Sequence, residues 1–339
     1  MVYIKIFLLI LIIIYFDIRK KTHLWIKISD VILNSSVIFL FIYFIVQIFN
    51  PSYKVFVDSV GVEYKIYYNI FYVNQNINIF SYKFIRNNGV FFEPGMYAVV
   101  LLYSLIINLF FSKKNNIRLF ILFLNMITTF STTGICMMFF VIGLKYFSSL
   151  QKRGLVRHIK IIFLPIIMSF LIYGIFYVYY GKVNNLYTNN GQGSYLYRID
   201  DIKNAFQLTL IKPFQGFGVG NFNILRLYTS IPERYYEGPA CASNTSNGLM
   251  IILYQLGLIN FVIIFYMYFV FIKNVSKIIN NSIATFSICL FLPVTLFSEP
   301  YSYTLFALMF FAYGVVYTFY NNNSTILTNN IVYENYTKN

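Results

Sequence analysis

Long apolar blocks separated by short polar segments dominate the chain. A helix that spans a bilayer needs ~20 mostly apolar residues. The blocks are Val2–Phe16, Val31–Phe49, Met96–Phe111, Leu119–Leu144, Ile159–Tyr180, Gly248–Ile272, Ile283–Phe297 and Ser302–Tyr320. The first block is short, and it carries no small-residue cleavage site. We therefore expect a retained helix there and not a removed signal peptide.

The composition agrees with this pattern. The chain is 58% hydrophobic and only 11% charged, whereas soluble domains are close to half apolar and a quarter charged. Its three cysteines, Cys136, Cys241 and Cys289, form neither a disulfide framework nor a metal-ligand spacing. We predict an all-α polytopic membrane protein in which no metal or cofactor takes part.

Charge is distributed unevenly along the chain. The formal net charge is +15, and the basic residues cluster around positions 19–27, 113–118, 145–160 and 273–277. The positive-inside rule assigns these segments to the cytoplasm, so they do not indicate nucleic-acid binding. Most acids, including Glu93, Asp201 and Glu299, fall in the alternate segments, which we expect outside. The N-terminus is then outside and the C-terminus inside.

The block Leu119–Leu144 is predicted to contain a turn. Arg118 and Lys145 both belong to basic segments, yet only 26 residues separate them, and two full crossings would take ~40. We predict two short, tilted helices or a re-entrant hairpin that turns near Thr128–Gly134. The alternative is one long kinked helix, which would move a strongly basic segment outside. With the turn, the chain makes about nine crossings.

Two outer segments, Asn50–Gly95 and Gly181–Ser246, are too long for simple connections, and long loops are usually functional. We predict one membrane domain, residues 1–320, that includes a large outer loop at 181–246. A disordered cytoplasmic tail at 321–339 completes the chain.

The second outer loop contains a predicted amphipathic helix. Within Tyr197–Lys212, apolar residues recur at helical spacing at Ile199, Ile202, Phe206 and Leu210. Such a stripe is typical of a helix that lies against a membrane or a helical bundle. Pro213 should end the helix. The following "GFGVGN" (Gly216–Asn221) has the wrong spacing for a dinucleotide fingerprint and predicts a glycine-rich turn.

The outer segments offer carboxylates and arginines, but no histidine. Arginine binds phosphate through bidentate contacts, and a carboxylate can accept a proton from a sugar hydroxyl. Arg86, Glu93 and Arg198 are therefore candidate catalytic residues. Snorkelling and helix capping are the alternative explanation for the first two. Arg198 with Asp201 is also consistent with a surface ion pair, and Glu299 with a turn acid.

Four segments resemble the O-antigen and capsule polymerases (Wzy-type) of the O-antigen polymerase and ligase superfamily. "RNNGVFFEPGMYA" (Arg86–Ala98) resembles their arginine and "G-x-F-x-E-P" signature, and "FSTTG" (Phe130–Gly134) their hydroxyl-rich helix break. "RIDDIKNAFQLTLIKPFQGFGVGNF" (Arg198–Phe222) resembles their large outer loop. "SNGLMIILYQLGLIN" (Ser246–Asn260) resembles the helix after that loop.

The resemblance implies a metal-independent, inverting glycosyltransferase in the bacterial inner membrane. It would transfer a growing glycan from undecaprenyl diphosphate to a new lipid-linked repeat unit on the outer face. The resemblance also implies a flippase and a chain-length regulator as partners. Arg86 and Arg198 would hold the diphosphate, and Glu93 would orient or deprotonate the acceptor. The candidate substrate-binding residues are Asp201, Gly218, Gly220, Asn221, Ser246, Asn247 and Glu299.

The chain departs from the family pattern at two positions. Ser246 stands where a histidine is common, and Gln255 where a glutamate is common. The missing histidine fits the polymerases better than the lipid A-core ligases. Three alternatives stay open: a ligase of the same superfamily, a polysaccharide flippase or transporter, and a membrane scaffold without enzymatic activity.

Overall fold

The structure of the protein is a computed structural model. It describes residues 2–19, 23–57, 63–79, 82–110, 116–150, 192–221, 224–225, 228, 247–279 and 281–320. The predicted block Ile159–Tyr180 and the predicted tail lie outside these residues. The count of nine crossings and the domain boundaries therefore stay predictions.

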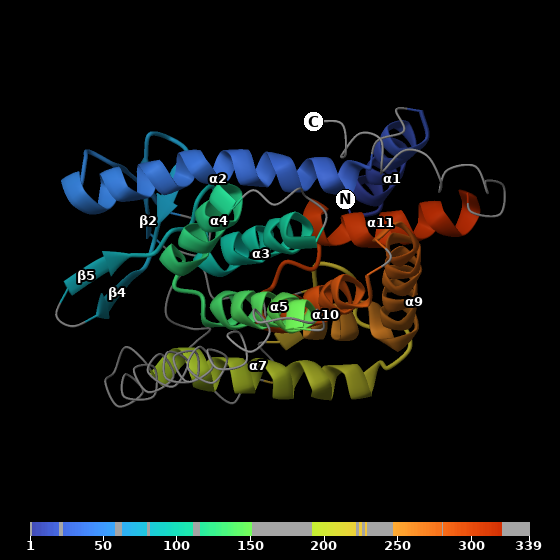
Figure 1. Cartoon of the computed structure of the whole chain (residues 1–339). Coiled ribbons are helices and arrows are strands. Elements are labelled where there is room, and N and C mark those ends of the chain that lie inside the picture. Colours follow the sequence, from blue (N-terminus) through green and yellow to red (C-terminus); the bar gives the residue numbers. More distant parts are fainter. Residues whose placement is uncertain are drawn as a thin grey trace.

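Helices make up most of the described chain (Figure 1). They are α1 Val2–Ile13, the π-helix η1 Ile14–Arg19, α2 Leu24–Phe49, α3 Pro94–Phe110, α4 Asn116–Thr128, α5 Thr132–Leu150, α7 Gln192–Ile211, α9 Gly248–Ile279, α10 Ser282–Ser298 and α11 Leu305–Tyr320. The bounds follow the apolar blocks within a few residues. Figure 1 shows α2 along one side of the bundle and α7 along the opposite side.

The predicted turn inside Leu119–Leu144 is confirmed, and the single kinked helix is wrong. Helix α4 ends at Thr128 and α5 begins at Thr132. Phe130 between them has φ 50°, a left-handed conformation that a helix does not continue through. The Ser131 hydroxyl accepts a hydrogen bond from the backbone N–H of Gly134 at 3.3 Å and caps the new helix.

The prediction of an all-α fold needs a correction, because the segment Asn50–Gly95 contains two small antiparallel sheets. Strands β1 Lys54–Val57, β2 Glu63–Tyr67 and β3 Phe71–Val73 form one, and β4 Asn76–Ile79 and β5 Tyr82–Ile85 the other. A turn with positive φ at Tyr68 and Asn69 joins β2 to β3. β-Branched and aromatic residues favour these strands. They are too short to show a clear alternation in the sequence.

Charged residues lie at both ends of the bundle. At one end, Arg118 lies 3.9 Å from Asp30, and the Lys145 Nζ lies 4.7 Å from the ring centroid of Phe110. At the other end, Glu93 precedes α3 and Glu299 follows α10. Which end faces the cytoplasm stays a prediction.

The glycine-rich turn closes against a kink in α9. Gly257 has non-helical φ 77° and ψ 171°, which interrupts the hydrogen bonds of that helix. The freed carbonyls of Tyr254 and Gln255 accept from the N–H groups of Phe217 and Gly218, both at 2.9 Å. Helix α7 ends before Pro213 as predicted, so the turn satisfies backbone groups that the kink would otherwise leave unpaired.

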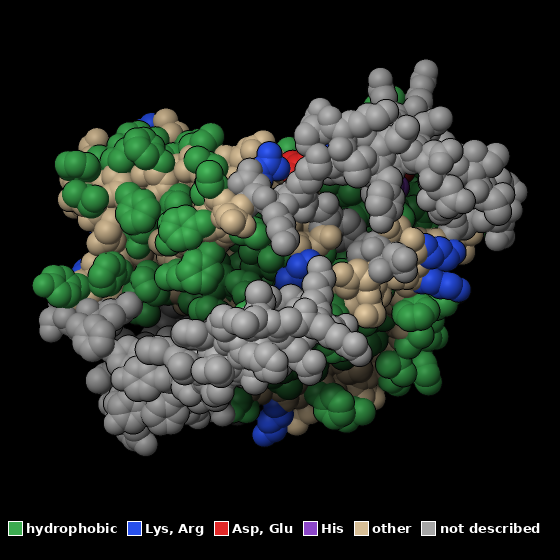
Figure 2. Space-filling view, in the orientation of Figure 1, with side chains coloured by type: hydrophobic (Ala, Val, Ile, Leu, Met, Phe, Trp, Pro, Cys, Tyr) green, Lys and Arg blue, Asp and Glu red, His purple; other side chains and the backbone are tan. Residues whose placement is uncertain are grey.

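Apolar side chains cover much of the surface. Figure 2 shows hydrophobic side chains gathered over α2 and α4, and Phe41 and Ile48 of α2 are each more than 65% exposed. Apolar patches of this kind mark contact with lipid or another protein. By length and composition, Leu24–Phe49 and Gly248–Ile278 qualify as membrane-crossing helices among the residues that the structure describes, and shorter apolar helices accompany them.

Replacing Gly257 by alanine should destabilise the fold. A Cβ there would lie 2.3 Å from the carbonyl oxygen of Phe214, on a backbone with positive φ. We expect the free energy of unfolding to fall by at least about 1–3 kcal/mol. The measurement is the thermal unfolding midpoint in detergent, which should be lower than that of the wild type. The matched control is Gly143→Ala in α5, where a Cβ meets nothing within 4 Å. Equal midpoints for the two variants would contradict the packing described here.

Candidate functional site

Four helix ends meet at the end of the bundle that carries Glu93 and Glu299. Helix α3 begins at Pro94, α5 at Thr132 and α9 at Gly248, while α10 ends at Ser298. Gly95 lies against the side-chain carboxylate of Glu299, and Gly248 lies against the backbone carbonyl of Glu299. Three of these ends are helix N-termini, where the backbone favours negative charge.

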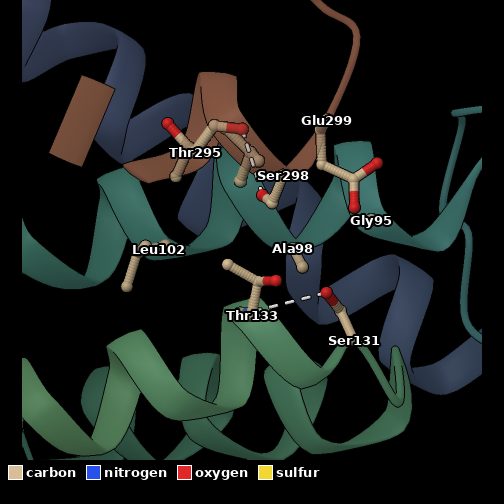
Figure 3. A pocket seen from close by; sticks show the side chains of 10 residues that line it. Gly95, Ala98, Leu102, Ser131, Thr133, Thr295, Ser298 and Glu299 are labelled. Atoms are coloured by element: carbon tan, nitrogen blue, oxygen red, sulfur yellow. Dashed lines mark hydrogen bonds between the residues drawn. The ribbon is translucent and has the colours of Figure 1, made fainter. Parts of the chain in front are cut away.

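Gly95 leaves the space that the Glu299 carboxylate occupies. A Cβ at Gly95 would lie 2.0 Å from Oε1 of Glu299 and 2.5 Å from Oε2. The carboxylate is almost buried, and Figure 3 shows it pointing toward Gly95 at the start of α3. The N–H groups at the N-terminus of a helix favour an anion. Glu299 therefore packs against the "EPG" segment (Glu93–Gly95) at the start of α3.

Hydroxyl groups surround a small cavity beside this carboxylate (Figure 3). Ser131 and Thr133 come from the start of α5, and Thr295 and Ser298 from the end of α10. The other lining residues, besides Glu299, are Gly95, Ala98, Val99, Leu102 and Gly134. The cavity leaves room for about one water molecule. A sugar ring is larger, so a sugar would reach these groups only from the cavity mouth.

Tyr301 supplies a further polar group next to Glu299. Its hydroxyl is hydrogen-bonded to the Thr295 hydroxyl, and its backbone N–H donates to the carbonyl of Glu299 at 3.0 Å. Burial, with a smaller contribution from the Glu299 carboxylate, raises the pKa of the Tyr301 phenol above its ordinary value. The phenol therefore stays neutral at neutral pH.

Arg86 binds the turn between α4 and α5. Its Nε donates to the carbonyl of Thr129 at 3.0 Å, and its Nη2 donates to the carbonyl of Phe130 at 3.3 Å. Its Nη1 donates to Oε1 of Gln75. The backbone N–H of Asn87 donates to the carbonyl of Thr128 at 2.9 Å. The guanidinium thus satisfies carbonyls that the helix break leaves without partners.

Residues 86–93 form an irregular loop, so Arg86 and Glu93 are not two turns apart on a helix. The half-buried Glu93 ends this loop, and its carbonyl accepts from the N–H of Tyr97 at 3.4 Å in the first turn of α3. Capping by the "EPG" segment is therefore real. It places Glu93 two residues before Gly95, the position that Glu299 contacts.

The predicted apolar stripe of helix α7 lies largely on the exposed side of that helix, which fits the membrane alternative of the prediction and not the bundle alternative. Asp201, Asn204 and Leu208 are buried, whereas the apolar Phe206 and Leu210 are more than half exposed. The Asn204 amide donates to Asp200 at 2.8 Å. Asp201 is therefore a buried carboxylate and not a surface partner. The Arg198 side chain lies outside the description.

The glycine turn is attached to α9 through the side chain of Gln255. The Gln255 Oε1 accepts from the N–H of Gly220 at 3.2 Å, and its Nε2 donates to the Tyr254 hydroxyl at 2.9 Å. A Cβ at either Gly218 or Gly220 would meet nothing within 4 Å. Both have positive φ. Glycine is therefore favoured at both positions by the backbone conformation and not by lack of space. Asn221 beside them is exposed.

Asn247 caps helix α9. Its Oδ1 accepts from the backbone N–H groups of Leu249 and Met250, at 3.0 and 3.2 Å. The Ser302 hydroxyl donates to the carbonyl of Gly248 at 2.7 Å, which attaches this cap to the segment after Glu299. Ser246 lies outside the described residues.

The structure groups some predicted site residues and leaves others apart. Glu299 lies against Gly95, two residues after Glu93 in the chain. Asn247 borders the same end, and Arg86 holds the neighbouring break. Gly218, Gly220 and Asn221 lie beside the α9 kink instead. The cavity residues Gly95, Thr133 and Ser298 are not among the predicted site residues. Gly95 and Thr133 lie within motifs that resemble the family, and Ser298 directly precedes Glu299. Among the described residues, no cluster of His, Cys, Asp or Glu could hold a metal ion.

These features define a mostly helical protein with apolar helices and a polar, hydroxyl-rich site where four helix ends meet. Residues 117–265 match the family model described as O-antigen ligase. The match confirms the resemblance to the O-antigen polymerase and ligase superfamily, a membrane-associated family of glycosyltransferase-like enzymes. It includes the helix break, α7, the glycine turn and the α9 kink, but not Arg86, Glu93 or Glu299. Comparisons with curated proteins and with solved structures give no match.

Gly95→Ala should displace the Glu299 carboxylate. Because the new methyl group would fill the space of Oε1, we expect Glu299 to rotate away or α3 to shift, at a cost of about 1–3 kcal/mol. Glycan transfer, the reaction class of the matching family, should fall sharply in cells carrying this variant while membrane levels of the protein stay similar. Gly143→Ala, whose methyl group meets nothing, should behave like the wild type. Normal glycan transfer by Gly95→Ala would show that this contact is dispensable.

Proposed function

We propose that the protein is an oligosaccharide repeat-unit polymerase, a multi-pass protein of the bacterial inner membrane. It transfers a growing glycan from undecaprenyl diphosphate to a new lipid-linked repeat unit on the outer face, in O-antigen or capsule synthesis. The observation that carries this proposal is the convergence of Glu299, the "EPG" segment and the hydroxyl-rich break on one polar end of an apolar bundle. The family match supports the reaction class.

The proposed reaction is a single displacement. A hydroxyl of the acceptor sugar attacks the anomeric carbon of the donor, and the bond from that carbon to the diphosphate oxygen breaks. The lipid diphosphate leaves with the electron pair, so the anomeric configuration inverts. The hydroxyl proton passes to a carboxylate, which acts as general base. No metal is required if cationic side chains and helix N-termini stabilise the leaving diphosphate.

Glu93 is the proposed base, and Glu299 orients the acceptor from the opposite helix. Glu93 is half-buried at the entrance to α3, whereas Glu299 is nearly buried against Gly95. The more accessible carboxylate is the better candidate for contact with a sugar, because the cavity beside Glu299 holds only about one water molecule. Ser131, Thr133 and Ser298 supply hydroxyl partners for the acceptor around the same mouth.

Arg86 and Arg198 are the proposed cations for the diphosphate. The contacts of Arg86 with the carbonyls of Thr129 and Phe130 fix its guanidinium beside the start of α5. The residue therefore also positions the hydroxyl-rich break. Asp201, the glycine turn and Asn221 would border the glycan farther from the reacting atoms, and Ser246 and Asn247 would border it at the start of α9.

A ligase is the second candidate, because the matching family model carries that description. A ligase would move the finished glycan to a different acceptor by the same displacement. The helix-end site described above serves either acceptor. The serine at position 246, where ligases are expected to have histidine, favours the polymerase.

Changes at Arg86 and Glu93 should abolish long-chain polysaccharide. Glu93→Gln removes the base while keeping its shape, and we expect elongation to fall about 100-fold or more. Arg86→Lys keeps the charge but loses the planar fork that reaches two carbonyls, so it should fail nearly as completely as Arg86→Ala. The measurement is gel analysis of glycan chain length at matched protein levels, with Gly143→Ala as control. Normal chains from Glu93→Gln would remove that residue from the mechanism.

Deleting the gene separates the two candidate functions. Loss of a polymerase should leave glycans of a single repeat unit on their final acceptor. Loss of a ligase should leave full-length polymer still attached to lipid diphosphate. Mass spectrometry of the lipid-linked and the transferred glycans gives the answer. Accumulated long lipid-linked polymer in the deletion strain would overturn the polymerase assignment and favour the ligase.

A further inference from the structure

An aromatic cluster lies on the three-stranded sheet next to the site. The strand register places Phe56 directly opposite Tyr64, and Tyr72 opposite Ile66, so these side chains share one face of the sheet. Phe92, from the loop before α3, packs on that face. Its ring centroid lies 5.0 Å from that of Tyr72, 5.1 Å from Tyr64 and 6.1 Å from Phe56.

The opposite face of the same sheet fixes it to the helices. Tyr67, Phe71 and Val73 are buried in the main hydrophobic core. The Tyr67 hydroxyl donates to Asn50 at 3.2 Å, and the Tyr72 N–H donates to the carbonyl of Gly89 at 3.1 Å. The aromatic face is therefore held in position relative to the loop that ends at Glu93.

Two of the four rings remain accessible. Phe56 is 42% and Phe92 45% exposed, whereas Tyr64 beneath them is buried. The planes of Phe56 and Phe92 differ by only 25°. These two side chains, which we call the phenyl platform, present nearly parallel rings. Phe92 is also the residue immediately before Glu93, so the platform is continuous with the proposed site.

Polar groups beside the platform indicate a ligand that is not simply lipid. Lys54 lies on the same face as Phe56, and its Nζ donates to Asn69 at 3.1 Å in an exposed pair. Sugar rings match this arrangement: their C–H faces pack on aromatic rings while their hydroxyls bond to neighbouring polar groups.

We propose that the phenyl platform is a carbohydrate subsite that holds a sugar ring of the glycan substrate beside Glu93. The inference rests on the proposed function for the identity of the glycan. It adds Phe56, which lies outside the segments that resemble the family, to the site, and it gives the small sheet a role. The rings bind and orient; no bond is made or broken there.

The test is glycan binding by the full-length protein in nanodiscs. The probe is a set of short oligosaccharides cut from the polysaccharide of the producing cells, and isothermal titration calorimetry measures the affinity. Phe92→Ala and Phe56→Ala should each weaken binding about three- to tenfold, because one ring contact is lost. Phe92→Tyr should retain binding, whereas Phe92→Leu, which keeps apolar bulk but no ring, should not.

Val55→Ala is the matched control, since Val55 is exposed on the same strand but on the opposite face. It should bind like the wild type, and thermal unfolding confirms that each variant folds. Equal affinity of Phe92→Leu and Phe92→Tyr, or no glycan binding by the wild type, would overturn the platform. The platform would also be overturned if the Phe92 and Phe56 variants differed from the wild type only in their association with glycan-free lipid vesicles. A polymerase that elongates normally in cells with Phe92→Leu would also count against the platform and leave the proposed function standing.

Discussion

The contact between the Glu299 carboxylate and Gly95 determines how the polar end of the bundle is assembled. A carboxylate can lie this close to a helix only where the helix has no side chain, and it is favoured in a first helical turn, whose N–H groups have no partner within the helix. Both conditions hold at the start of α3. The contact joins the end of α10 to the start of α3, and the cap of α9 packs on the same segment through Gly248 and Ser302.

The neighbouring helix break depends on a second set of contacts to the same loop. Arg86 and Asn87 donate to carbonyls at the end of α4, so the chain can turn at Phe130 without leaving buried acceptors unpaired. That turn brings Ser131 and Thr133 toward Gly95. One loop of irregular backbone, residues 86–93, thus organises both the carboxylates and the hydroxyls, and its last residues reach the phenyl platform.

The features that could be predicted from the sequence follow from strong physical constraints. The turn near Thr128–Gly134 followed from charge and length, because 26 residues between two basic segments cannot cross a bilayer twice as full helices. The helices followed from apolar block length. The sheets were missed because strands of three to five residues carry little pattern. The Gly95–Glu299 contact joins segments far apart in the chain, and no local pattern predicts such a pairing.

Helix α7 shows that apolar spacing alone does not distinguish a face that packs on the bundle from a face that is exposed. The periodic apolar residues Phe206 and Leu210 are exposed, and the buried face carries Asp201 and Asn204. In a protein surrounded by lipid, apolar residues gain little by turning inward, so small and polar residues often occupy the helix contacts. The glycine turn was predicted, but its partner was not, because the kink at Gly257 appears only in the backbone conformation.

The central claim is that the polar helix-end site catalyses glycan transfer between two lipid-linked substrates. The most direct measurement uses the purified protein in liposomes, with lipid-diphosphate-linked repeat unit as the sole glycan and no nucleotide sugar or added metal. The account predicts a ladder of lipid-linked oligomers with release of one lipid diphosphate per new linkage, and no ladder with Glu93→Gln. If the folded wild-type protein left the single repeat units unchanged, this claim would be contradicted.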